Sequence, residues 1–181
     1  MPNLKPFRDY SEHDVINLFQ VSGTYPITKG TFVTVFGSGV NLRDENQLDN
    51  ISPFGNSHSA KFNVPWAAYA APSGTTRSNA LGVTLKDVRT VDENGELLIF
   101  RPRKAAEMDV IISGQACPIL TRGALLYSGI VGTPSYGSGA LPSDAGDGSL
   151  KVAGAYNAST HVAKFLGPIN QDGYALIEVN I

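Results

Sequence analysis

Cysteine, charge and helix-favouring runs are all scarce in this sequence. Its one cysteine, Cys117, excludes an internal disulfide. Charged residues make up 17% of the chain and the net charge is −2, so no strong field draws it to nucleic acid or to an anionic membrane. No apolar run approaches membrane-spanning length, and the first ten residues lack the apolar core of a signal peptide. We therefore expect a protein made in a cytoplasm, with neither nucleic acid nor membrane as its partner.

Signals of catalysis and metal binding are equally thin. The three histidines, His13, His58 and His161, share no metal-ligand spacing with each other or with Cys117. Cys117 lies in an apolar stretch, which predicts a buried, inert thiol. No serine has a GxSxG context, and residues 37–42 begin like a dinucleotide fingerprint without its third glycine. We expect no enzyme, no cofactor and no metal site.

Two further patterns allow a functional and a structural interpretation. Residues 144–148 faintly resemble a calcium loop, but they lack its alternating ligands and final glutamate, so a turn is favoured. Residues 101–104, Arg-Pro-Arg-Lys, form the one basic cluster, which can meet an acidic surface or a phosphate backbone. Acidic residues nearby balance the cluster, and a solvated loop is favoured.

Strand signals recur along most of the chain, and 19 glycines with 11 prolines separate them. In residues 175–179, Ala175, Ile177 and Val179 share one face and Glu178 the other. Asn94-Gly95 predicts a tight turn between strands at 89–91 and 97–100. Further strands are expected in residues 30–36, 81–86, 109–114, 119–127, 150–153 and 161–166. The sequence predicts an all-β protein, a small β-barrel or β-sandwich with an N-terminal arm and long loops.

The domain organisation follows from the same pattern. Residues 1–29 are expected to form an N-terminal arm and residues 30–181 the β-domain, with a long insertion at 40–79 and a Gly/Ser-rich loop at 132–149. Within the arm, Ser11 can cap a short helix through Phe19, or Val15 to Phe19 can be an edge strand.

Apolar side chains are concentrated in the arm and in the insertion. They either fold over the end of the barrel or contact another subunit. The residues predicted for an interface with a partner protein or another subunit are Leu4, Phe7, Tyr10, Val15, Ile16, Phe19, Phe54, Phe62, Trp66 and Tyr69.

Several segments read together carry a resemblance. In order these are KGTFVTV at 29–35, LGVTLK at 81–86, VIISG at 110–114, TRGALLY at 121–127 and LGPI at 166–169. This order resembles the capsid decoration, or cement, proteins of tailed bacteriophages, over most of residues 21–36 and 80–181. The resemblance implies a non-enzymatic virion protein on the outer surface of the capsid, often a homotrimer, that binds the major capsid protein and stabilises contacts between capsomers. It does not account for the insertion at 40–79.

Two other classes compete with this interpretation. A phage tail, spike or carbohydrate-binding module would use exposed aromatic residues, namely Trp66, Tyr69, Tyr136 and Tyr156, to hold sugar rings. A small β-barrel hydrolase or isomerase would need a pair of perturbed titratable groups, and the sequence offers no candidate pair.

Overall fold

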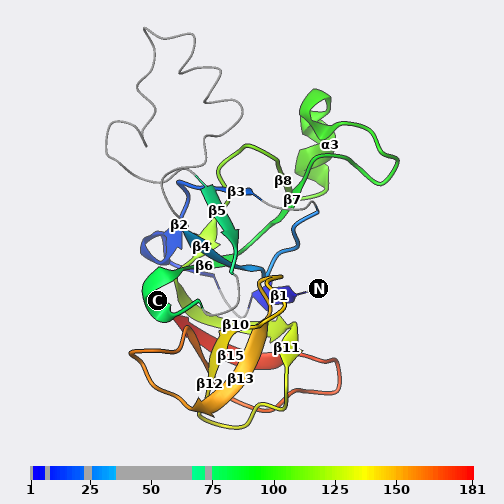
Figure 1. Cartoon of the computed structure of the whole chain (residues 1–181). Coiled ribbons are helices and arrows are strands. Elements are labelled where there is room, and N and C mark those ends of the chain that lie inside the picture. Colours follow the sequence, from blue (N-terminus) through cyan, green and yellow to red (C-terminus); the bar gives the residue numbers. More distant parts are fainter. Residues whose placement is uncertain (1, 7–8, 23–25, 36–66, 72–74) are drawn as a thin grey trace, which may run out of the picture.

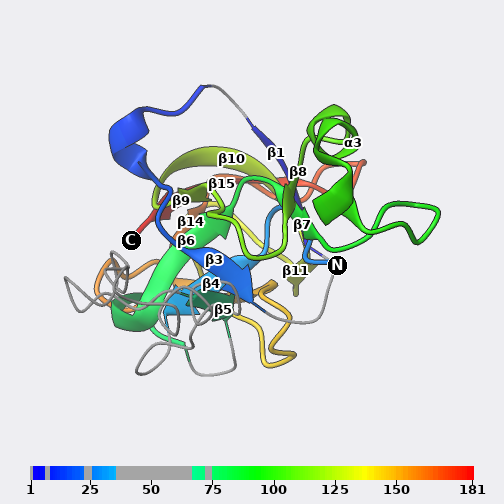
Figure 2. The ribbon, with the colours of Figure 1, turned by 90° about the horizontal axis from the view of Figure 1, so that it is seen from above.

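The computed structural model describes residues 2–6, 9–22, 26–35, 67–71 and 75–181. Of these residues, 42% lie in strands and 11% in helices, which confirms the predicted all-β class. The strands form a seven-stranded sheet, a six-stranded sheet and a pair, and a curled sheet forms a half-barrel. Figure 1 shows the six-stranded sheet stacked above the seven-stranded one, and Figure 2 shows from above that the two overlap.

The seven-stranded sheet has the order β1-β10-β15-β14-β12-β13-β11. Its strands are β1 Asn3–Pro6, β10 Arg122–Ser128, β11 Ile130–Val131, β12 Ser138–Pro142, β13 Leu150–Ala155, β14 Ala163–Phe165 and β15 Ala175–Asn180. At its centre β10 and β15 pair antiparallel, with Leu125 opposite Ile177. The alternation predicted for β15 is confirmed, since Ile177 and Val179 are buried and Glu178 is exposed.

The six-stranded sheet has the order β2-β9-β6-β4-β5-β3. Its strands are β2 Val15–Ile16, β3 Gln20–Ser22, β4 Phe32–Val35, β5 Ala67–Ala70, β6 Ala80–Thr84 and β9 Ile119–Leu120. Strand β9 is followed after one residue, Thr121, by β10 of the other sheet. One stretch of chain therefore passes from sheet to sheet at Thr121, so the single strand predicted at 119–127 is divided between the two sheets.

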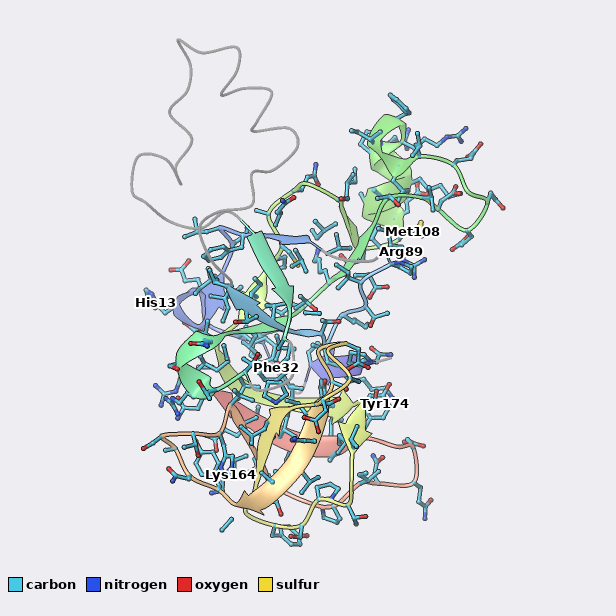
Figure 3. The ribbon with its side chains drawn as sticks, in the orientation of Figure 1. His13, Phe32, Arg89, Met108, Lys164 and Tyr174 are labelled. Atoms are coloured by element: carbon cyan, nitrogen blue, oxygen red, sulfur yellow. The ribbon has the colours of Figure 1, made fainter. Side chains whose placement is uncertain are left out.

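The main core fills the space between the sheets. Phe32, Leu120 and Tyr127 have no exposed surface there, and Figure 3 labels Phe32 between the sheets. The carbonyl of Gly148 accepts hydrogen bonds from the Phe32 amide at 2.9 Å and the Tyr127 hydroxyl at 3.2 Å. Gly148 has a φ of +73°, and a Cβ there would lie 2.7 Å from the Phe32 carbonyl oxygen. Only glycine fits this position, and burial raises the pKa of Tyr127 above its ordinary value.

In the described part of the chain, helices are few and short. They are η1 Glu12–Asp14, η2 Arg77–Asn79, η3 Leu98–Phe100 and α3 Pro102–Glu107. Ser11 caps η1 by accepting the His13 amide at 3.3 Å, and β2 follows, so both interpretations of this segment hold in part. Within the residues described, no helix has the length and apolarity that crossing a bilayer requires.

Three local predictions differ from the structure. The basic cluster at 101–104 belongs to η3's C-cap and helix α3, not to a loop, because Pro102 occupies the first helical turn and Lys104, Ala105 and Ala106 favour helix. Residues 98–100 form η3 instead of a strand. Strand β12 lies inside the predicted loop at 132–149, where it pairs with β13 on one side and β14 on the other.

The segment predicted as an N-terminal arm supplies strands to both sheets. Strand β1 pairs with β10, β2 with β9 and β3 with β5. Leu4 of β1 lies opposite Tyr127 and is fully buried. The described part of this segment therefore builds the β-domain itself.

Candidate functional site: an exposed apolar tip

A projecting excursion interrupts the β-domain between β7 (Asp87–Arg89) and β8 (Val110–Ile112). The two strands are parallel neighbours, so the chain between them forms a crossover that contains η3 and α3. Val88 is fully buried and exchanges two backbone hydrogen bonds with Ile27, at 2.8 and 3.0 Å. Both ends of the excursion are thus fixed to the body, from which it stands out in Figure 1 and Figure 2. Figure 3 labels Arg89 and Met108 at its base.

The excursion carries four exposed apolar side chains, which are called the apolar tip below. The members and their exposed fractions are Val91 at 39%, Leu97 at 50%, Ile99 at 58% and Phe100 at 78%. They are half of the eight large hydrophobic side chains that are exposed in the described part of the chain, and all four fall within ten residues. Scattered exposed apolar residues need no explanation, but a concentration of them marks a contact site.

Hydrogen bonds and packing within the excursion keep the side chains of the apolar tip exposed to solvent. Val91 and Leu97 face each other across an antiparallel bridge, and Gly95 takes the turn between them with a φ of +81°. The Leu98 amide donates to Thr90 at 3.1 Å, and the Leu98 side chain is fully buried. Because Leu98 points inward within a three-residue turn, the side chains on either side of it remain exposed.

Asp92 joins the turn to helix α3. Its carboxylate, which has no exposed surface, accepts the backbone amides of Asn94 at 2.8 Å and Glu96 at 2.9 Å, and also the Lys104 ammonium group. The Lys104 hydrogen bond, with those from the two amides, lowers the pKa of Asp92 to about 2. The same contact raises the pKa of Lys104. A buried carboxylate with three donors fixes the shape of the tip.

Exposed ion pairs on the excursion contribute less. Arg101 contacts Glu96 at 2.8 Å and Asp109 contacts Lys86 at 2.7 Å, both largely in solvent, where such pairs are worth about 0 to 1 kcal/mol. Arg103 on α3 is exposed and forms no ion pair with any residue that the structure describes.

The N-terminal residues predicted for an interface lie mostly in the chain's own cores. Leu4 belongs to the main core, with Tyr10 and Val15 packed against it. Phe19, 6% exposed, belongs to a second cluster against which Ile16 packs. Among the described residues of this segment, Leu18 is the large apolar side chain that is exposed, at 59%. A binding role for the segment stays a prediction.

The remaining residues predicted for the interface fall elsewhere. Phe7, Phe54, Phe62 and Trp66 lie outside the described residues. Tyr69 belongs to β5, opposite Thr34, but its side chain is not described. The insertion's part in an interface therefore stays a prediction as well.

The groups considered for catalysis have structural surroundings. Cys117 is fully buried, as predicted, and desolvation raises the pKa of its thiol to about 12. His161 is buried and its Nδ1 accepts the Asn157 amide at 2.8 Å, whereas His13 is exposed. His58 lies outside the described residues. Among the residues described, no three His, Cys, Asp or Glu side chains gather into a metal-sized group.

The clefts in the described part of the chain include two near the sheets. One, of about 190 Å³, is lined by Lys29, Lys86, Asp87 and Asp109 together with Leu4, Pro6, Leu85 and Met108. The other, of about 330 Å³, is lined by Asp14, Arg122, Gly123, Ala124 and Glu178. Charged groups of both signs line both clefts.

Sequence reasoning missed the apolar tip. The available signal was the unbroken apolar run at 97–100, one residue after the Asn94-Gly95 turn, because a half-buried strand would alternate. In comparisons with known proteins, no family model matches the chain and no curated protein matches its sequence.

Proposed function

We propose that the protein is a non-enzymatic decoration protein that binds the outer surface of a tailed-phage head through the major capsid protein. The observation that carries this proposal is the apolar tip, which exposes Phe100 at 78% on a unit fixed by a buried carboxylate. Exposed apolar side chains on a rigid support favour association with another protein. The resemblance of the strand segments to capsid decoration proteins supplies the kind of partner.

The position of the tip suits a protein that connects neighbours. In Figure 1 and Figure 2 the excursion lies at the right of the molecule, whereas η1 and β2, an edge strand of the six-stranded sheet, lie at the left. Leu18, just after β2, is also exposed, at 59%. A protein that stabilises contacts between capsomers needs contact points at separate places on a rigid body, and a homotrimer would multiply them.

Binding to heads tests the proposal. Purified protein is mixed with undecorated expanded heads of the phage whose genome encodes the chain and, separately, with unexpanded procapsids, and the co-sedimenting protein is quantified. Saturable binding to expanded heads at a fixed copy number per capsomer supports the proposal. Absence of binding to both particles refutes it.

A carbohydrate-binding module of a tail or spike is the second candidate, and the exposure of Tyr136, at 78%, favours it. Other tyrosine rings are less open, since Lys164 lies over the Tyr156 ring at 5.8 Å and Lys5 over the Tyr174 ring at 4.4 Å. A glycan-array measurement on the isolated protein separates the two candidates, because a decoration protein binds no glycan.

A further inference from the structure

We propose that Asn94 deamidates spontaneously in the folded protein, and that the isoaspartate product loosens the contacts of the Asp92 carboxylate. Asn94 is thus a modification site within the excursion, and the co-reactant is water. The inference goes beyond the proposed function and does not depend on it, because the reaction needs no partner protein.

The pair Asn94-Gly95 is the only Asn-Gly in the sequence. Deamidation begins when the backbone nitrogen of the following residue attacks the carbonyl carbon of the asparagine side chain. A glycine at the following position has no Cβ to hinder this approach. Every other asparagine of the chain precedes a residue with a side chain, so the attack is least hindered at Asn94.

The structure leaves the reacting groups of this pair open. Asn94 and Gly95 are both exposed, and no atom lies within 4 Å of the place that a Cβ on Gly95 would take. The side-chain amide of Asn94 has no hydrogen-bond partner among the described residues. The Gly95 amide donates to the Asp92 carbonyl at 3.3 Å, beyond the usual range of roughly 2.7–3.2 Å. Only this long hydrogen bond opposes movement of the Gly95 nitrogen toward the side chain.

The reaction balances with water alone. Hydroxide takes the proton from the Gly95 nitrogen, which then forms a bond to Cγ of Asn94. The bond between Cγ and the side-chain nitrogen breaks, and this nitrogen takes a proton from water and leaves as ammonia. The resulting succinimide adds water at one of its two carbonyl carbons and opens to aspartate or isoaspartate. Both products carry one more negative charge than asparagine.

Isoaspartate changes the backbone that the Asp92 carboxylate holds. The amides of Asn94 and Glu96 both donate to Oδ1 of Asp92, at 2.8 and 2.9 Å. In isoaspartate the main chain passes through the former side chain and is one atom longer between these two amides. The longer chain does not fit both donors in the same positions, and a lost donor leaves the buried carboxylate less compensated. The added charge repels Asp92 as well.

The turn itself requires the glycine that makes Asn94 reactive. Gly95 has a φ of +81°, which a residue with a Cβ rarely adopts. Asn94 is not among the described residues with positive φ, so another small polar residue can replace it. The experiments below therefore vary Asn94 and keep Gly95.

Peptide mapping of the incubated, folded protein tests the reaction. Trypsin releases Asn94 in the peptide 90–103, because Pro102 blocks cleavage after Arg101. Mass spectrometry gives the fraction of amide converted to acid over time at pH 7 and pH 8. Labelling by an isoaspartate methyltransferase distinguishes isoaspartate from aspartate.

The peptide 165–181 is the internal control. Its Asn170 is also exposed, but Oδ1 of Asn170 accepts the amides of Asp172 at 3.0 Å and Tyr174 at 2.8 Å. The residue after it, Gln171, has a side chain. We expect most of the peptide 90–103 to convert, faster at pH 8 than at pH 7, while the control stays largely unchanged. Equal conversion of the two peptides, or conversion of 90–103 only in denaturant, would overturn the assignment.

Thermal unfolding tests the effect on Asp92. Wild-type protein after incubation should unfold at a lower temperature than fresh protein, whereas Asn94→Ser, which cannot deamidate, should be unchanged by incubation. Fresh Asn94→Asp carries the new charge without the longer backbone, so its unfolding temperature should fall less. If converted wild type unfolds at its original temperature, or if fresh Asn94→Asp falls just as far, the loosening by isoaspartate is wrong.

Discussion

Among single residues, Asp92 has the strongest influence on the candidate site. Its side chain is shielded from water, yet it keeps its charge because Lys104 and two backbone amides donate to it. Removal of Lys104 would leave a buried carboxylate without its counter-charge, which is destabilising. The projecting excursion has few other buried polar contacts to replace it.

Lowering the pH should destabilise the excursion, because it protonates the Asp92 carboxylate. The folded pKa of about 2 lies below the ordinary value of 3.8, so the carboxylate stabilises the fold above about pH 4. This stabilisation is lost as the pH falls from 3.8 toward 2. We expect the melting temperature of the wild type to drop as the pH falls through this window. The Asp92→Asn variant should have a lower melting temperature than the wild type at pH 7, and its melting temperature should drop less as the pH falls. Parallel pH dependences in calorimetry would contradict this role.

Cys117 should resist thiol reagents in the folded protein. Its side chain is fully buried and its pKa is raised to about 12, so the reactive thiolate is rare at pH 8. We expect labelling with a chromogenic disulfide reagent to be slow in buffer and fast in denaturant. Rapid labelling of the native protein, at the rate of a free thiol, would show that this cluster opens readily.

At the scale of elements, β1 shows how the N-terminal segment serves the fold. Leu4 is fully buried opposite Tyr127, whereas Leu18 of the same segment is 59% exposed. We expect Leu4→Ala to lower the free energy of unfolding by about 2 to 5 kcal/mol, because it leaves a cavity in the main core.

The matched substitution is Leu18→Ala, which should change the free energy of unfolding by less than about 0.5 kcal/mol. Urea titration followed by fluorescence measures both. Equal effects of the two substitutions would mean that β1 is not held in the sheet in solution. If Leu18→Ala instead weakens binding to heads, the N-terminal segment contributes to the interface as predicted.

Elements with a strong local pattern could be predicted from the sequence. Strand β15 alternates cleanly, β8 falls inside a predicted strand and β6 overlaps one, because β-branched and apolar residues dominate them. Strands β1 and β12 could not be predicted, since each contains a proline and no alternation. Their pairing depends on neighbours far away in the sequence, such as β10 for β1.

The candidate site likewise combines features that could be predicted from the sequence with features that could not. The Asn94-Gly95 turn could be predicted because its φ requirement is local, and the structure confirms it. The buried position of Leu98 between exposed neighbours could not be predicted from the sequence. It depends on the packing of η3 against α3. Helix α3 itself had a signal in Pro102 at its first turn, but a six-residue helix is too short for a periodic pattern.

At the scale of the whole molecule, two stacked sheets form a body from which the tip projects on one side, whereas η1 and β2 lie on the other. The sheets share a core and one continuous stretch of chain at β9 and β10. A body of two sheets with one shared core is compatible with the proposed role between capsomers.

The heat resistance of filled heads tests the central claim most directly. DNA-filled expanded heads are heated with and without saturating protein, and DNA release is followed with an intercalating dye. If the protein stabilises contacts between capsomers, saturation raises the release temperature, and Phe100→Ser at the same concentration raises it less. An unchanged release temperature on heads that carry a full complement of protein would contradict the claim.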